Sequence, residues 1–189
     1  QVHLLLGHQF ALKGYAYLII INGHATLASA FKKNKRKNID NIQNCLKYFQ
    51  SIGINIVDGK EFGSRGSFSL PFGNFKLPYL IGESGGYQDY LFGFGMRMSM
   101  ISGLAAALSI ASKKKEALAL LSDVNKKRRV SFINRLFYER LNNYQLASFA
   151  NKIANVDNPL SVLSSAYKWD IKNLVRWKKI NKNYEIRPT

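Results

Sequence analysis

The stretch LPYLIGESGGYQDYLFGFGMRMSMISGLAAALSIAS, residues 77–112, decides how the chain is organised. Residues 77–81 form a short apolar run, which predicts a buried strand ending at Gly82. Two glycines, Gly93 and Gly95, stand directly before a helix predicted over residues 96–111. The stretch therefore predicts a strand–loop–helix unit of the kind that builds mixed α/β structures.

The loop of that unit is the candidate site. Glu83 follows the carboxyl end of the predicted strand, where ligands of α/β proteins commonly bind. The small residues Ser84, Gly85 and Gly86 allow a ligand to approach the backbone, and their N–H groups suit phosphate. The helix after Gly95 starts with unpaired N–H groups and a partial positive charge, which suit an anion. A buried helix reached by a glycine-rich loop, with no ligand, explains the same residues, since the pattern is neither GxGxxG nor a Walker loop.

The residues before this unit are typical of β-structure. Two β-rich runs, 15–21 and 25–31, are joined at Asn22-Gly23, which is a strong hairpin signal. A helix is predicted from an N-cap at Asn38 to the stop at Gly53, followed by a short strand at 54–57 and a loop over 61–74. Beyond Ser112 the pattern predicts helices at 115–124, 130–141, 145–153 and 159–177.

The predicted fold class is therefore α+β (mixed α/β). An antiparallel sheet comes first, a strand–helix unit follows it, and the rest of the chain is helical. We divide the chain into segments 1–76, 77–112 and 113–189.

Composition limits the classes of protein. The 189 residues are 47% hydrophobic, which excludes wholesale disorder, and no apolar run is long enough to cross a membrane. The start does not resemble a secretory signal. A net charge of +17 favours acidic partners, namely nucleic acid, anionic lipid or acidic protein. The basic runs 32–37, 113–115 with 126–129, and 176–182 are more typical of a solvated surface, and no nucleic-acid-binding motif accompanies them.

The single cysteine and the three histidines give no metal-binding or catalytic pattern. The single cysteine, Cys45, excludes a disulfide framework and lies beside an apolar helical stripe, so we expect a buried hydrophobe. His3, His8 and His24 show no metal-ligand spacing, so no metal is expected.

GESGGYQDYLFGFGMRMSMISGLAAA, residues 82–107, resembles the second flavin motif of FAD-dependent oxidoreductases of the geranylgeranyl-reductase-like group, within the hydroxylase-type flavoproteins. GHQFALKGYAYLII, residues 7–20, is similar to a strand of that family's substrate domain. The resemblance covers about residues 1–112. It implies an enzyme that passes a hydride between FAD and an apolar substrate such as an isoprenoid lipid.

Matched residue by residue, the resemblance gives each candidate a role. Glu83 would hydrogen-bond the ribityl chain of FAD. The backbone at Ser84, Gly85 and Gly86 would approach the pyrophosphate or ribityl region. Tyr15 and Tyr17 would lie near the substrate cavity. The pyrimidine edge of the flavin would face Gly93, Phe94, Gly95 and Met96.

The chain departs from the family at three points. Ser84 replaces the commoner alanine, and Ile19–Ile21 stand where the family has Phe-Pro-Lys. The GxGxxG motif that holds the ADP half of FAD is missing, so the chain matches the carboxyl-terminal half of such an enzyme. We expect it to need an amino-terminal FAD-binding half or a partner chain, and to bind FAD weakly or not at all alone. These residues do not identify a catalytic acid or base.

Two other interpretations remain. The chain could be a non-enzymatic basic domain that docks on anionic membrane or nucleic acid, because Trp169 and Trp177 are interleaved with basic residues as in interfacial segments. It could also be a split subunit whose exposed sheet edge needs a partner. The expected location is the cytoplasm, with peripheral membrane contact in the flavoenzyme interpretation.

Overall fold

The structure is a computed structural model, and it describes residues 1–32, 40–64, 66 and 75–183 of the 189-residue chain. Its three-stranded antiparallel sheet and its helices form an α+β fold, which confirms the predicted class. The chain folds as two compact units: unit 1 comprises residues 1–64 and 138–159, and unit 2 comprises residues 65–137 and 160–189. The segments 1–76, 77–112 and 113–189 do not coincide with these units.

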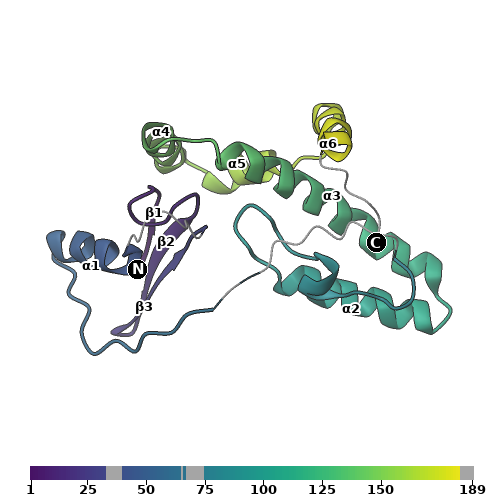
Figure 1. The fold of residues 1–189 in the computed structure, drawn as a ribbon, viewed down its shortest axis with the longest axis horizontal. Helices are drawn as coiled ribbons and strands as arrows, with labels where there is room; N and C mark the ends of the chain where they lie inside the picture. The colour runs from purple at the N-terminus through teal and green to yellow at the C-terminus, as the bar shows by residue number, and fades with distance from the viewer. Residues whose placement is uncertain (33–39, 65, 67–74, 184–189) are drawn as a thin grey trace. The chain divides into compact units, whose positions relative to one another are not determined.

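Unit 1 is built on the sheet, whose strands lie in the order β1-β2-β3 (Figure 1). β2 (Tyr15–Ile21) and β3 (His24–Ala30) form the predicted hairpin. Asn22 and Gly23 take φ angles of 49° and 79°, which this dipeptide tolerates. β1 (Val2–Leu5), which the sequence did not predict, pairs with β2 so that Leu5 lies opposite Ala16.

Helix α1 (Asn41–Ser51) packs against this sheet. The Asp40 carboxylate caps it by accepting a hydrogen bond from the backbone N–H of Gln43 at 3.0 Å. The predicted cap, Asn38, lies outside the described residues. The core of unit 1 comprises Leu5, Ala16, Leu18, Cys45 and Phe49.

The predicted strand at 54–57 is wrong. Ile54 and Ile56 pack their side chains against the core of unit 1, but no strand in the described part of the chain pairs with their backbone. The two isoleucines are therefore used here for packing rather than for sheet hydrogen bonds.

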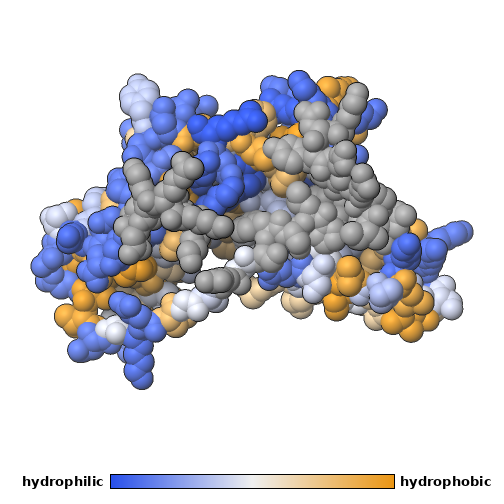
Figure 2. Space-filling model, in the orientation of Figure 1, coloured by the Kyte–Doolittle hydropathy of each residue, from blue (hydrophilic) through white to orange (hydrophobic). Residues whose placement is uncertain are grey.

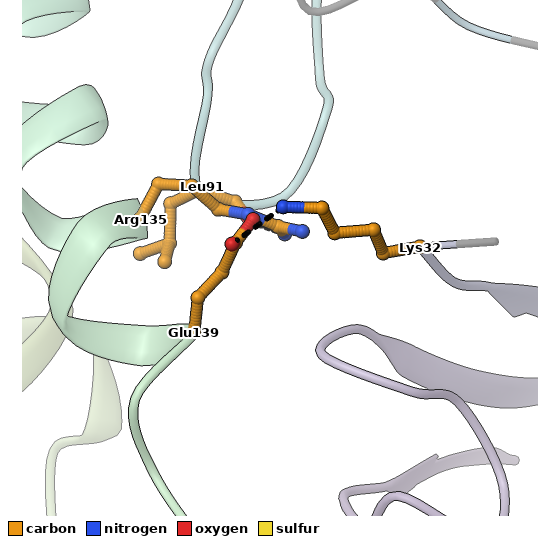
Figure 3. A network of polar contacts seen from close by, with 4 residues as sticks. All are labelled: Lys32, Leu91, Arg135 and Glu139. Atoms are coloured by element: carbon orange, nitrogen blue, oxygen red, sulfur yellow. Dashed lines mark hydrogen bonds and ion pairs between the residues drawn. The ribbon is translucent and has the colours of Figure 1, made fainter. Parts of the chain in front are cut away.

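The later part of unit 1 contains α4 (Asn143–Ala154), which confirms the helix predicted at 145–153. A capping box between Asn142 and Gln145 fixes its start. Lys32 forms an ion pair with Glu139 at 2.9 Å (Figure 3), and the Tyr138 hydroxyl donates to the carbonyl of Gly14. These long-range contacts join the carboxyl-terminal part of the unit to the sheet region.

Unit 2 is mainly helical. A short 3-10 helix, η1 (Gly82–Gly85), is followed by α2 (Met96–Ile110), which confirms the helix predicted at 96–111. The predicted strand at 77–81 is wrong: Pro78 lacks a backbone N–H, and no described strand pairs with this segment. The unit therefore has the loop and helix of the predicted strand–loop–helix motif without its strand.

The helices after α2 begin and end at other residues than predicted. The helices predicted at 115–124 and 130–141 are one continuous helix, α3 (Lys114–Tyr138), because residues 125–129 include no helix breaker. The helix predicted at 159–177 is two helices, α5 (Pro159–Ala166) and α6 (Ile171–Asn183). Asp170 separates them, and its carboxylate accepts from the N–H of Asn173 at 2.8 Å at the start of α6.

Two apolar clusters hold unit 2 together. One joins α2 to α3 and is formed by Tyr87, Ala105, Ala117, Leu121 and Val124. The other joins α3 to α6 and is formed by Tyr90, Phe132, Ile133 and Trp177. Both include a tyrosine from residues 86–95, so this glycine-rich segment is fixed against the helices that follow it.

Candidate functional site

The glycine-rich turn at residues 82–86 is closed by its own backbone. The N–H groups of Gly86 and Tyr87 each donate at 2.8 Å, to the carbonyls of Glu83 and Gly82. Gly86 takes the left-handed conformation with φ 64°, which favours glycine. A Cβ at Gly85 would lie 2.3 Å from the carbonyl oxygen of Leu80. The fold itself therefore requires glycine at both positions.

A buried arginine holds this turn from the inside. Arg128 on α3 is 2% exposed, and its Nη2 donates to the carbonyl oxygen of Gly85 at 2.9 Å. Its guanidinium lies 4.2 Å from the ring centroid of Tyr87, and its Nη1 donates to Oδ1 of Asn125 at 2.9 Å. Burial lowers the pKa of Arg128 and raises the pKa of Tyr87.

Tyr90 reinforces the same turn. Its hydroxyl donates to the carbonyl of Gly86 at 3.1 Å, and its backbone N–H donates to Oγ of Ser131 at 3.0 Å. The sequence predicts a solvated surface for the run 126–129, and that prediction is wrong for Arg128. The charge run alone contains no signal that one member would be buried.

The loop after Tyr90 is organised by Asp89, which is 7% exposed. The Asp89 carboxylate accepts from the N–H of Phe92 at 2.8 Å, and its backbone bonds to both Gly93 and Phe94. The hydroxyl of Tyr167 also hydrogen-bonds Asp89; burial, followed by the charge of Asp89, raises the pKa of Tyr167. Neither Asp89 nor Tyr167 is among the predicted site residues, although Asp89 belongs to the motif at residues 82–107.

Arg135 holds the same loop from α3. Its Nη1 donates to the carbonyl of Leu91 at 3.2 Å (Figure 3). Gly93 takes φ 80°, so it too is a glycine that the backbone requires. The loop that leads into α2 is thus fixed by side chains from α3 and from the segment between α5 and α6.

The start of α2 is different. Gly95 is its N-cap, at φ −129°, and no side chain caps the first turn. A Cβ at Gly95 would meet ordinary contacts, the first being Cβ of Gln88 at 3.6 Å. The fold of the chain therefore does not require glycine at position 95, whereas a ligand close to this backbone would.

A pocket of about 810 Å³ opens beside the start of α2. Its wall includes Gly93, Phe94, Gly95 and Met96, half of the predicted flavin-binding residues. Farther along, α2 and α3 supply mainly apolar side chains. The other lining residues are Asp89, Arg97, Met98, Ile101, Ala119, Leu120, Asp123, Val124, Lys127 and Tyr167.

The charged residues of the pocket wall are partly paired. Lys127 and Asp123 form an i,i+4 ion pair at 2.9 Å, and the hydrogen bond from Lys127 lowers the pKa of Asp123. Both side chains are well exposed, so the pair adds little to stability. The pocket thus combines an apolar interior with a mixed-charge rim.

The remaining predicted site residues do not line this pocket. Gly85 and Gly86 are buried in the turn, while Glu83 and Ser84 are exposed on it. Tyr15 and Tyr17 belong to β2 in unit 1, where both are half-buried and their rings stack with centroids 6.2 Å apart. The structure therefore brings the second half of the predicted set to one pocket and not the first half.

The residues considered for metal or nucleophilic chemistry are placed elsewhere. Cys45 is fully buried in the core of unit 1, as predicted, and burial raises the pKa of its thiol to about 11. Within the described residues, no three His, Cys, Asp or Glu side chains gather in a way that could hold a metal ion. His3 packs edge-on against Phe49.

Comparison of the chain with protein-family models, curated proteins and solved structures gave no match. Over the residues that the structure describes, no helix has the length and apolar character needed to cross a membrane.

Proposed function

We propose that this chain carries the flavin-facing loop of an FAD-dependent oxidoreductase, with an apolar substrate such as an isoprenoid lipid. The observation on which the proposal rests is the pocket beside the start of α2, whose wall includes Gly93, Phe94, Gly95 and Met96. These are the residues that the resemblance assigns to the pyrimidine edge of the flavin.

The pocket has properties that suit such a ring. Its volume of about 810 Å³ lies within the range of roughly 300–1,000 Å³ that is usual for small-molecule sites. Met98 and Ile101 give it an apolar wall, and Gly95 leaves the backbone at the helix start open to close approach. The residues present therefore fit the group.

The contribution of the protein follows from the same geometry. When bound, the flavin supplies hydride transfer. The first N–H groups of α2, which no side chain caps, would stabilise negative charge on a ring placed against them. Exposed Glu83 and Ser84 would hold the ribityl and pyrophosphate part, while Gly85 and Gly86 serve the fold of the turn.

The ADP half of FAD would be held by a dinucleotide-binding unit, in a longer polypeptide or in a partner chain. Unit 2 has an apolar surface that suits such a partner, visible as apolar residues over α2 in Figure 2. Met96, Met100 and Leu104 on α2 are 86%, 76% and 54% exposed. Ile81, in extended backbone with φ −118° and ψ 165°, is also exposed.

The stacked pair Tyr15 and Tyr17 would line the substrate cavity. The protein would work in the cytoplasm with peripheral membrane contact.

The test is to purify the protein under native conditions from its own cells, together with whatever it is joined or bound to. We expect flavin absorption bands and release of flavin on denaturation. Gly95→Leu, which places a side chain at the mouth of the pocket, should abolish the flavin. The control Gly59→Leu should retain it, because a Cβ at Gly59 meets no atom within 4 Å. A folded protein without flavin, or a Gly95→Leu protein with full flavin content, would refute the proposal.

A further inference from the structure

Helix α6 presents an outer face that combines aliphatic and basic side chains. Its inner face is fixed by Trp177 and Ile180, which belong to the cluster with Phe132 and Ile133 of α3. On the opposite face Ile171 and Val175 are 80% and 61% exposed. At 100° per residue these two lie one above the other.

Lysines flank this aliphatic stripe on both sides. Lys172, Lys178 and Lys179 are exposed, and Lys168 is exposed just before the helix. Over residues 168–179 five basic residues stand against one acidic residue, Asp170, whose carboxylate is engaged in capping α6. Figure 2 shows apolar and hydrophilic residues side by side over this helix.

The tryptophans that suggested an interfacial segment are not part of this face. Trp177 is 8% exposed, and Trp169 is half-buried. The guanidinium of Arg129 lies 5.6 Å from the ring centroid of Trp177 and 5.9 Å from that of Trp169. Trp177 is therefore used for packing, and the exposed apolar side chains of this face are aliphatic.

We propose that the outer face of α6 docks on an anionic lipid surface, with Ile171 and Val175 entering the headgroup boundary and the lysines facing lipid phosphates. Aliphatic residues between lysines are the pattern of helices that lie in the membrane interface. The lysines alone would also suit the phosphates of a nucleic acid. Proteins that bind single strands stack the bases on aromatic side chains, however, and the described residues of this face include no exposed aromatic side chain. The face therefore suits lipid better than nucleic acid. The proposal does not depend on flavin binding.

The test is co-sedimentation of the full chain with vesicles of phosphatidylcholine, with and without phosphatidylserine. We expect binding to the anionic vesicles that weakens with salt, and little binding to the neutral ones. Lys178→Gln with Lys179→Gln should weaken partitioning about 30-fold, at roughly fivefold for each lysine near the surface. Ile171→Ser with Val175→Ser should weaken it about 10-fold or more.

The control is Lys47→Gln with Lys152→Gln, two exposed lysines of unit 1 that give the same change in net charge. It should retain binding within about threefold. The proposal is overturned if the control loses as much binding as the α6 lysine variant, or if the serine variant binds like the wild type. Binding to polyuridylate RNA without binding to anionic vesicles would also overturn it, because the surface would then serve nucleic acid.

Discussion

Substitution by alanine should reduce the stability of the protein at a glycine that the fold requires, and leave it nearly unchanged at a glycine that the fold does not require. Gly85 and Gly95 lie in the same glycine-rich segment and would look alike to sequence reasoning. In the structure a Cβ at Gly85 would lie 2.3 Å from the carbonyl oxygen of Leu80 and 2.8 Å from Cδ2 of Tyr87. At Gly95 the first contact would be Cβ of Gln88 at 3.6 Å.

The expected magnitudes follow from these distances. The carbonyl beside Gly85 belongs to the backbone and the ring beside it is packed, so Gly85→Ala must shift the turn away from Arg128. Overpacking of this kind costs about 3 kcal/mol, which lowers Tm by roughly 6–12 °C for a chain of this size. At Gly95 the φ angle of −129° accepts alanine; the entropy gained relative to glycine and the poorer N-cap offset each other to within about 1 kcal/mol.

The assay is thermal unfolding followed by circular dichroism, together with urea unfolding to obtain the free energy. Gly85→Ala should be strongly destabilised and Gly95→Ala should unfold close to the wild type. If Gly85→Ala unfolds within about 2 °C of the wild type, the close approach of the Leu80 carbonyl is wrong. If Gly95→Ala loses as much stability as Gly85→Ala, the fold needs glycine there, and the argument for a ligand against that backbone fails.

Three further predictions concern buried polar groups. Arg128→Ala should lower the free energy of unfolding by about 3 kcal/mol in urea, because it leaves the Gly85 carbonyl without its donor and opens a cavity; a loss below about 0.5 kcal/mol would contradict this. Tyr167→Phe should cost about 1–2 kcal/mol, because Asp89 loses a hydrogen bond. Since the folded state raises the pKa of Tyr167, wild-type stability should also fall as the pH rises above the unfolded value of about 10, and the phenylalanine variant should lack that part of the fall. Alkylation of Cys45 by iodoacetamide at pH 8 should be slow until the protein unfolds, because the thiol pKa of about 11 leaves little thiolate; rapid alkylation of the folded chain would show that the thiol is accessible.

Two features that local sequence decides were predicted correctly. The Asn22-Gly23 turn fixes the β2–β3 hairpin because this dipeptide accepts positive φ angles at both positions. Helix α2 follows from a long run of helix-compatible residues after Gly95. Both depend on residues close in sequence, so no knowledge of distant partners is needed.

The features that depend on distant partners were missed. β1 is a strand because it pairs with β2, in which Ala16 lies opposite Leu5 and Ile19 lies opposite Val2. The segments 54–57 and 77–81 have no strand partner among the described residues. Apolar character does not say whether a ladder, side-chain packing or neither will bury a residue. Ile54 and Ile56 pack against the core of unit 1, whereas Leu77, Leu80 and Ile81 are exposed. Residues 83–86, the first half of the predicted flavin-binding residues, were likewise chosen by residue type. They do not line the pocket, because its wall is decided by the packing of the later helices against the loop at 89–95.

The residues that fix the candidate site are mostly not those that line it. Arg128 holds the turn at Gly85 from 43 positions later in the sequence, and Arg135 and Tyr167 hold the following loop at Leu91 and Asp89. Two of these bonds end beside the pocket, on Gly85 and Leu91, whereas Asp89 and Tyr167 belong to its wall. Together they position the start of α2 before any ligand arrives. Such preorganisation removes part of the ordering cost of binding. It follows that substitutions at the anchoring side chains should disturb a ligand through the geometry of the loop, whereas a substitution at exposed Ser84 is the better test of direct contact.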